Sequence, residues 1–230
     1  MRLPFTSEQF FDVFRRYNEA IWPAQWVLVA LGLAALVLTL RGTPRGSRVI
    51  AGILALLWLW MGVEYHLASF AAINPAARLF AAAFTVQAGI VAWKGVWRTQ
   101  LAFRAPAGLR GVTGGVILTY AFVGYPLLGE MLGHHYPYAP TFGAPCPTTL
   151  FTLGLLLWAA PPVPRLVWVI PVVWSLIGTS AAALLGVWED LGLAVAAGLL
   201  LLSEPPGMPG RLPTVRHFLT PVRHFGRQRG

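Results

Sequence analysis

The sequence consists mainly of apolar runs of about 15 to 22 residues, separated by short polar connections. An α-helix rises about 1.5 Å per residue, so a helix of this length crosses a hydrocarbon core about 30 Å thick. Only 11% of the residues are charged, whereas a soluble domain carries about 25%. The sequence therefore predicts an all-α, polytopic bundle of transmembrane helices and excludes an ordinary water-soluble globule.

Seven spans are expected, and together they form one helix bundle over residues 20–203. Their ranges are Ile21–Leu40, Val49–Phe70, Ala76–Val96, Val112–Leu132, Thr148–Ala160, Leu166–Leu184 and Val187–Leu202. The last two ranges form one nearly continuous apolar stretch that is too long for a single crossing. Gly186 and the acidic pair Glu189 and Asp190 mark the point of division, and six spans is the alternative if the chain does not turn there.

Lysine and arginine residues are concentrated in every second connection and in the C-terminal segment. They are Arg41, Arg45, Arg48, Lys94, Arg98, Arg104, Arg110 and Arg165, followed by Arg211, Arg216, Arg223, Arg227 and Arg229. Short loops rich in these residues stay on the cytoplasmic side of a membrane, so the N-terminus is expected outside and the C-terminus inside. The formal net charge of +9 is then a signal of topology, and no nucleic-acid partner is expected.

Two segments flank the predicted bundle. Residues 1–19 form a predicted amphipathic helix at the membrane surface, because phenylalanines recur at helical spacing among charged residues and Thr6 or Ser7 can cap its start. Residues 204–230 form a predicted basic cytoplasmic tail, in which the tetrapeptide VRHF occurs twice. Arginine next to phenylalanine suits a surface of anionic lipids, which are the expected partner of this tail.

Ionisable side chains within the predicted spans lie toward the outer face. Counted from the cytoplasmic end of each helix, Glu64 and His66 lie about 22 to 26 Å along the second span, and Glu130 about 27 Å along the fourth. An ionisable group within hydrocarbon is costly, so each is a candidate for function. The alternative is that the two carboxylates pair with Arg78 or with aromatic donors and only hold helices together.

Nitrogen, oxygen and sulfur donors near this outer face predict a metal site. Glu130 and His134 are four residues apart and share one face if the helix continues through Gly133. Cys146 lies between two prolines at the expected start of the fifth helix, where the helix dipole favours a thiolate; the alternative is a small apolar filler. The predicted ligands of a zinc, copper or iron ion are His66, Glu130, His134, His135 and Cys146, with Glu64, Asn74, Arg78, Glu189 and Asp190 as supporting polar residues.

Three classes of function fit this pattern. The first is a small permease or a metal- and cation-handling protein, although Gln87 and few other polar groups are available for an inner pathway. The second is a non-catalytic subunit or scaffold, in which the same groups hold helices and partner subunits together in a larger membrane complex. The third, an enzyme, is less favoured: it would need Glu64 or Glu130 as a base beside a metal-bound water.

Several short motifs are informative together: Leu3-Pro4-Phe5-Thr6, Tyr17-Asn18, Trp22-Pro23-Ala24-Gln25, Tyr65-His66, Ile73-Asn74-Pro75, Tyr136-Pro137 and Pro145-Cys146-Pro147-Thr148. They resemble an uncharacterised family of bacterial multi-pass membrane proteins, some members of which carry a loose transporter-permease label. The resemblance implies a protein of the bacterial inner membrane, and it implies no substrate, reaction or site residue. A weaker similarity to membrane-embedded zinc hydrolases of the ceramidase type conflicts with the lack of histidine in Leu191–Leu202.

Overall fold

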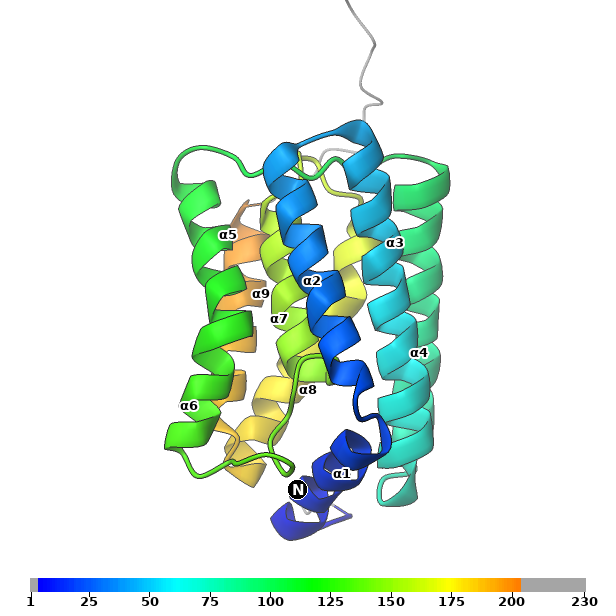
Figure 1. Cartoon of the computed structure of the whole chain (residues 1–230), viewed down its shortest axis with the longest axis vertical. Helices are drawn as coiled ribbons and strands as arrows, with labels where there is room; N and C mark the ends of the chain where they lie inside the picture. Colours follow the sequence, from blue (N-terminus) through cyan, green and yellow to red (C-terminus); the bar gives the residue numbers. More distant parts are fainter. Residues whose placement is uncertain (1–3, 204–230) are drawn as a thin grey trace, which may run out of the picture.

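The computed structural model describes residues 4–203, which form a bundle of helices (Figure 1). Its α-helices are α1 (Ser7–Ala20), α2 (Ala24–Arg41), α3 (Pro44–Trp60), α4 (Ala77–Val91), α5 (Leu109–Thr119), α6 (Tyr125–Met131), α7 (Pro145–Leu157), α8 (Arg165–Leu185) and α9 (Leu191–Ser203). Short π- and 3₁₀-helical stretches continue or join them: η1 (Met61–Ser69), η2 (Phe70–Ala72), η3 (Ala92–Trp97), η4 (Tyr120–Gly124) and η5 (Trp188–Asp190). The all-α prediction is confirmed, and the predicted tail at residues 204–230 lies outside the described residues.

Five continuous helical stretches are long and apolar enough to cross a membrane. They are Ala24–Arg41, Pro44–Ala72, Ala77–Trp97, Leu109–Met131 and Arg165–Leu185. Each corresponds to a predicted span, whereas the number of seven crossings and their orientation stay predictions. The helices of the two remaining predicted spans, α7 and α9, have 13 residues each. This is about 20 Å of helix, which is shorter than a hydrocarbon core.

The second predicted span begins too late. It is predicted from Val49, but α3 begins at Pro44, because proline suits the first helical turn. The Thr43 side chain accepts a hydrogen bond from Gly46 N at 3.0 Å and caps this helix. The basic connection after α2 is therefore shorter than the apolar pattern suggests, and part of its charge lies on the helix itself.

The division between the last two spans is correct at Gly186, which ends α8 with a φ of +82°. The seventh span is predicted from Val187, but residues 188–190 form the turn η5 and α9 begins at Leu191. Glu189 and Asp190 therefore lie in a turn between two helices and not within a span.

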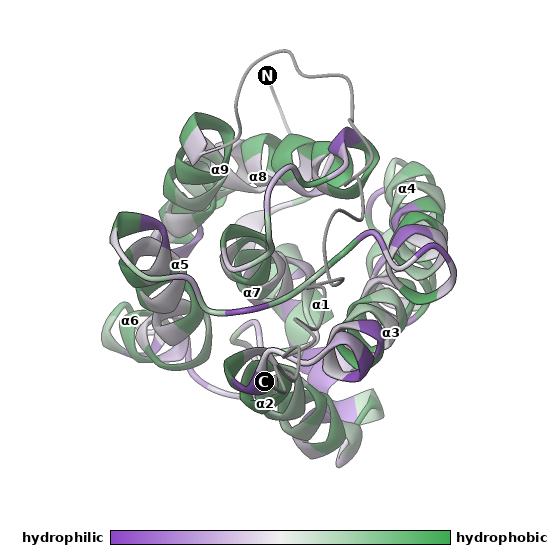
Figure 2. Ribbon diagram, turned by 90° about the horizontal axis from the view of Figure 1, so that it is seen from above, coloured by the Kyte–Doolittle hydropathy of each residue, from purple (hydrophilic) through white to green (hydrophobic). Residues whose placement is uncertain are grey.

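The short helix α7 lies at the centre of the bundle, and Figure 2 shows the other helices arranged around it. All of its residues except Cys146 are buried. The surrounding helices expose large apolar side chains on their outer faces, among them Leu40, Leu79, Val116 and Leu184. A helix at the surface of a soluble protein carries polar side chains on that face, so this arrangement is typical of a bundle in a membrane.

Arginine and main-chain hydrogen bonds close the C-terminal end of α7. Arg110 Nε donates to Leu157 O at 2.7 Å. Its Nη atoms reach three further carbonyl oxygens, at 3.2 to 3.4 Å, those of Leu156, Ala159 and Ser203. Residues 102–104, in the loop before α5, pair with residues 158–160 through two main-chain hydrogen bonds. The central helix thus ends in a hydrogen-bonded layer of loops.

The amphipathic helix α1 lies across the opposite end of the bundle (Figure 1). Its start is a capping box, in which the Thr6 side chain accepts from Gln9 N and the Gln9 side chain accepts from Thr6 N, so the predicted cap is confirmed at Thr6. Tyr17 joins α1 to the bundle: its hydroxyl donates to Gly143 O at 3.0 Å and accepts from Trp60 Nε1 at 2.8 Å. Gly143 precedes α7, so α1 covers the N-terminal end of the central helix.

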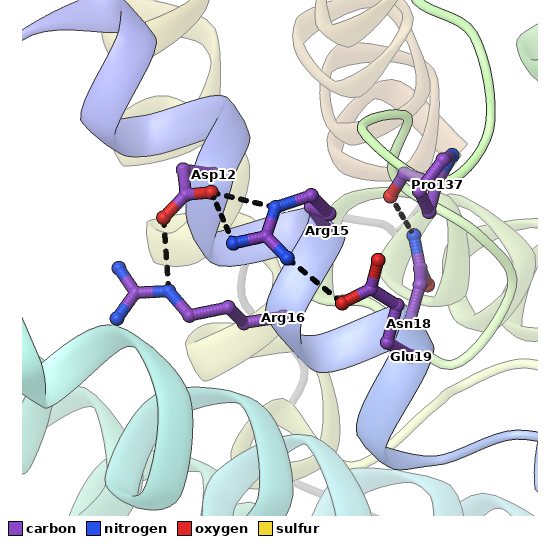
Figure 3. A network of polar contacts seen from close by, with 6 residues as sticks. All are labelled: Asp12, Arg15, Arg16, Asn18, Glu19 and Pro137. Carbon is purple, nitrogen blue, oxygen red and sulfur yellow. Dashed lines mark hydrogen bonds and ion pairs between the residues drawn. The ribbon is translucent and has the colours of Figure 1, made fainter.

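The outward face of α1 carries a row of ion pairs (Figure 3). Arg15 contacts Asp12 at 2.7 Å and Glu19 at 2.8 Å, and Arg16 contacts Asp12 at 3.0 Å. On the inward side, Asn18 Nδ2 donates to Pro137 O at 2.7 Å. The charged outer face agrees with the predicted amphipathic pattern, and the placement of α1 at a membrane surface stays a prediction.

Candidate functional site

A cavity of about 160 Å³ lies between α1 and the bundle, beside the start of α7. Aromatic side chains form much of its wall: Phe5, Phe10, Phe14, Tyr65, Phe70, Phe80 and Trp174. The rings pack against one another, with 5.1 Å between the centroids of Phe10 and Phe14 and 5.4 Å between those of Phe5 and Phe70. The apolar face of α1 therefore closes one side of the cavity.

Asp190 is the acidic side chain of this cavity, and none of the described basic side chains lines it. Although the residue lies in the turn η5, it is only 4% exposed. The Tyr125 hydroxyl donates a hydrogen bond to Asp190 Oδ1 at 2.6 Å. Burial raises the pKa of the Asp190 carboxyl to about 7, and this effect outweighs the hydrogen bonds from Tyr125 and Cys146 that favour the ionised form.

Cys146 and Trp174 bring a sulfur and an indole N–H to the same cavity. The Cys146 thiol lies beside both the Asp190 carboxylate and the Trp174 indole. A Cβ added at Gly178 would lie 3.6 Å from Cys146 Sγ and 3.9 Å from Trp174 Nε1. The indole nitrogen is buried and has no hydrogen-bond partner within the residues that the structure describes. Three polar groups thus gather in a cavity that is otherwise mostly apolar.

The thiolate at Cys146 stays a prediction, whereas its predicted place at the start of the fifth helix is confirmed. The residue does lie in the first turn of α7, after Ala144 as the cap and Pro145 as the first helical residue. The neighbouring Asp190 carboxylate opposes a negative charge on the sulfur, whereas the helix dipole favours one.

His66 is completely buried among aromatic rings. Its ring centroid lies 4.4 Å from that of Phe84, 5.0 Å from Trp174 and 5.7 Å from Phe80. Neither ring nitrogen has a hydrogen-bond partner among the described residues. Two residues earlier, the Glu64 side chain is half-buried. His66 therefore lies against four rings of the cavity wall, those of Tyr65, Phe70, Phe80 and Trp174, without lining the cavity itself.

His134 pairs with Glu189 across the end of the bundle. Its Nδ1 lies 2.8 Å from Glu189 Oε1, and its ring lies against Phe11, with 4.6 Å between the centroids. Glu189 is fully buried, and its Oε2 has no partner within residues 4–203. The Tyr120 hydroxyl donates to the main-chain oxygen of Glu189 at 2.6 Å, which fixes the turn η5 against η4.

The predicted pairing of Glu130 with His134 on one helix face is wrong. The helix α6 ends at Met131, and Gly133 adopts a φ of +89°, so the chain turns before His134. Glu130 instead contacts the next histidine, with 2.7 Å between its Oε1 and His135 Nδ1. Both side chains of this second pair are more than 60% exposed.

The other predicted supporting residues have separate surroundings. Asn74 lines the cavity, and its Oδ1 accepts a hydrogen bond from Ala76 N at 3.1 Å before α4 begins. Arg78 is exposed on the first turn of α4. Within the described part of the chain, no three histidine, cysteine, aspartate or glutamate side chains are grouped so as to hold a metal ion. The five predicted ligands are thus divided among separate places, and a bound metal stays a prediction.

The sequence pattern misses two residues that shape the cavity. Tyrosine and tryptophan are common in the aromatic belt at a membrane surface, so these residue types alone give no reason to place Tyr125 or Trp174 at a cavity. For Trp174 a signal was present: it lies nine residues into the 21-residue helix α8, far from either end. Tyr125 carries no such signal, because its contact with Asp190 depends on how α6 packs against η5.

Comparison with known proteins identifies a family for this chain. The profile of a family described as a family of unknown function, DUF6064, matches residues 7–204. No curated protein and no solved structure matches the chain. The matched range includes every helix of the bundle, and it agrees with the expected resemblance to an uncharacterised family.

Proposed function

Because the chain belongs to DUF6064, a family of unknown function, its activity has to be inferred from its own geometry, and we propose that it is an integral membrane protein that binds a small molecule in the cavity beneath α1. The cavity serves as the outer binding site of a small permease. One observation carries this proposal: a mostly aromatic cavity contains a buried carboxyl group, a thiol and an unpartnered indole N–H. Ligand sites generally combine apolar walls with a few placed polar groups in this way.

The size of the cavity limits the ligand. An apolar cavity of about 150 Å³ in another protein holds one benzene ring. The cavity beneath α1 measures about 160 Å³ and therefore suits a ligand with one ring-sized apolar part. The side formed by α1 rests on few buried residues, namely Val13, Phe14, Tyr17 and Asn18. A displacement of this helix would enlarge the cavity without disturbing the central α7.

We further propose that the protein crosses a bacterial inner membrane seven times, with α1 outside and the C-terminus inside. The apolar outer surface of the bundle and the basic residues at the ends of the helices remote from α1 support this arrangement. The short helices α7 and α9 count as the fifth and seventh crossings, and their neighbours shield their ends.

Reporter fusions are expected to show this sidedness. A reporter that is active only in the periplasm should be active when fused after Pro140 and silent when fused after Arg104. Pro140 belongs to the loop beneath α1, whereas Arg104 N bonds Trp158 O at the opposite end of the bundle. A reporter active only in the cytoplasm provides the control: it should be silent after Pro140 and active after Arg104. The reverse pattern would place the cavity on the cytoplasmic side and contradict the proposal.

The single cysteine, Cys146, allows a test of access to the cavity. In native membranes we expect methyl methanethiosulfonate to modify this thiol. The reagent adds only a small methylthio group, which is measured by mass spectrometry of the intact protein. Ser180 is an exposed residue of the cavity wall, and Ser180→Trp should slow the modification by about tenfold because the indole fills the space.

The matched control for this test is Leu176→Trp on the same helix. Leu176 is 62% exposed and does not line the cavity, so the modification rate should stay at the level of the unchanged protein. Modification that occurs only after unfolding would show that the cavity admits no small molecule. The proposed function would then fail.

Metal handling is the second candidate function, and the buried Glu189 favours it. Glu189 Oε2 has no partner among the described residues, while Oε1 contacts His134. A zinc, copper or iron ion takes nitrogen and oxygen donors of this kind. The tag-free protein is expected to carry such a metal by elemental mass spectrometry, and His134→Ala should reduce the amount. Glu130→Ala is the control, because this carboxylate belongs to the exposed pair with His135. Protein that stays free of metal after the growth medium is supplemented with metal would contradict the expectation.

A further inference from the structure

We propose that the ligand of the cavity is an organic cation with a ring-sized apolar group, and that the Asp190 carboxylate is its counter-ion. This inference rests on the proposed function, because it names the chemical class of the molecule that occupies the same cavity. It follows from the placement of one buried carboxylate at a wall that is otherwise aromatic, aliphatic or neutral and polar.

The hydrogen-bond partners of Asp190 are neutral. Tyr125 donates to Oδ1 at 2.6 Å, and the Cys146 thiol lies beside the same carboxylate. Within residues 4–203, no lysine or arginine forms an ion pair with Asp190. Neutral donors offset only part of the cost of burying a carboxylate, because they do not supply the opposite charge. A cation in the cavity supplies it where the surrounding dielectric is low.

The walls of the cavity also favour a cation. The faces of aromatic rings carry negative charge density and attract ammonium groups within about 6 Å of the ring centroid. Two pairs of packed rings line the cavity: Phe14 with Tyr65, and Phe80 with Trp174. The apolar part of an organic cation gains burial against the same walls. A ligand of this class therefore pairs its charge with the carboxylate and packs its apolar part against the rings.

Other ligand classes fit the cavity less well. An anion would be repelled by Asp190, and a neutral molecule gains nothing from its charge. A metal ion needs three or four donors, whereas the described lining offers one carboxylate and one sulfur. The adjacent Glu189 does not line the cavity, because its carboxylate is turned toward His134. The ionised form of Asp190 thus presents one negative charge to the ligand, which matches a cation of single charge.

Three probes of one shape and different charge test this inference on the full-length protein in lipid nanodiscs. They are benzyltrimethylammonium, its uncharged carbon analogue neopentylbenzene, and the anion phenylmethanesulfonate. The measurement is the rate at which methyl methanethiosulfonate modifies Cys146, expressed relative to the rate of the same protein without probe. We expect benzyltrimethylammonium to slow the modification at a concentration at least about tenfold lower than either other probe.

The variant Asp190→Asn keeps the shape of the side chain and removes its charge. It should lose the preference for the cation, so that benzyltrimethylammonium and neopentylbenzene protect Cys146 to similar extents. Asp12→Asn is the matched control, because Asp12 contacts Arg15 and Arg16 on the outward face of α1, and it should leave the preference unchanged. The comparison of the three probes on the unchanged protein decides the matter even if Asp190→Asn does not fold.

Failure of this inference and failure of the proposed function give different results. Equal protection by all three probes, or no protection although Cys146 reacts readily, would overturn the assignment of a cation and leave an accessible cavity. Retention of the full cation preference in Asp190→Asn would also overturn it. A Cys146 thiol that never reacts in the folded protein would instead remove the cavity itself as a binding site.

Discussion

Gly143→Ala is expected to destabilise the protein by about 3 kcal/mol. Gly143 has a φ of +103°, a conformation that residues with a side chain rarely adopt. An added Cβ would overlap Leu28 Cδ1 and lie 3.4 Å from Tyr17 Oη. Since Gly143 O also accepts the hydrogen bond from Tyr17, the turn cannot move away without releasing α1. The free energy of unfolding, measured in mixed micelles by titration with sodium dodecyl sulfate, gives the effect.

Two other glycines provide matched controls for this substitution. Gly52 in α3 and Gly198 in α9 have open space where a Cβ would be placed. Alanine is the better helix former by about 1 kcal/mol, so Gly52→Ala and Gly198→Ala should leave the protein as stable as before or slightly more so. If Gly143→Ala behaves like these two variants, α1, α2 and the start of α7 do not meet at this turn.

Asn18→Ala should have an effect of similar size, about 3 kcal/mol, because it leaves several buried polar groups without partners. Asn18 is fully buried, and its Nδ2 donates to Pro137 O at 2.7 Å and to Ala139 O at 2.8 Å. Its Oδ1 accepts from the Thr141 hydroxyl at 2.7 Å. The same substitution should raise the rate at which Cys146 is modified, because α1 loses its attachment to the loop over residues 137–141.

The neighbouring Glu19 separates this effect from a general weakening of α1. Glu19 is exposed and contacts only the half-exposed Arg15 in Figure 3, so Glu19→Ala should leave the free energy of unfolding nearly unchanged. Asn18→Asp offers a second comparison: it keeps an acceptor for Thr141 but loses both donors, and it should be as unstable as Asn18→Ala. Wild-type stability of either Asn18 variant would contradict the described attachment.

The helices themselves could be predicted because a long apolar run or a cap depends only on nearby residues. Thr6 at the start of α1 and Gly186 at the end of α8 are local signals that the structure confirms. Gln87, the polar residue considered for an inner pathway, instead joins two helices, since its Nε2 donates to Val167 O of α8 at 2.6 Å. A polar side chain in an apolar span has few possible hydrogen-bond partners besides a neighbouring helix. The sequence can therefore predict that such a hydrogen bond forms, but not which residue accepts it.

The central position of α7 could not be predicted. In a membrane, a helix in the centre of a bundle and a helix facing lipid are both apolar all round, so hydropathy does not separate them. The cavity could not be predicted either, because its polar groups come from elements far apart in the sequence. Tyr125 and Asp190, for example, are 65 residues apart. Their contact depends on how complete helices pack.

One error was avoidable from the sequence. Glycine is the usual residue just beyond a helix end, and Gly133 follows α6 in that position. Treating it as part of the helix produced the incorrect pairing of Glu130 with His134. Read as a stop signal, it predicts a turn before His134; the contacts of His134 with Glu189 and of His135 with Glu130 come from the structure.

The two ends of α7 are covered in different ways. At its start the covering element is one helix, α1, attached through side-chain hydrogen bonds of Tyr17 and Asn18. At its end the covering layer is main chain bonded to main chain, fastened by Arg110. Side chains rotate out of a path within nanoseconds, whereas bonded backbone opens only when several hydrogen bonds break together. In the proposed permease, release of a ligand past α1 therefore breaks side-chain hydrogen bonds, whereas passage to the other side of the membrane would require the bonded loops and Arg110 to separate.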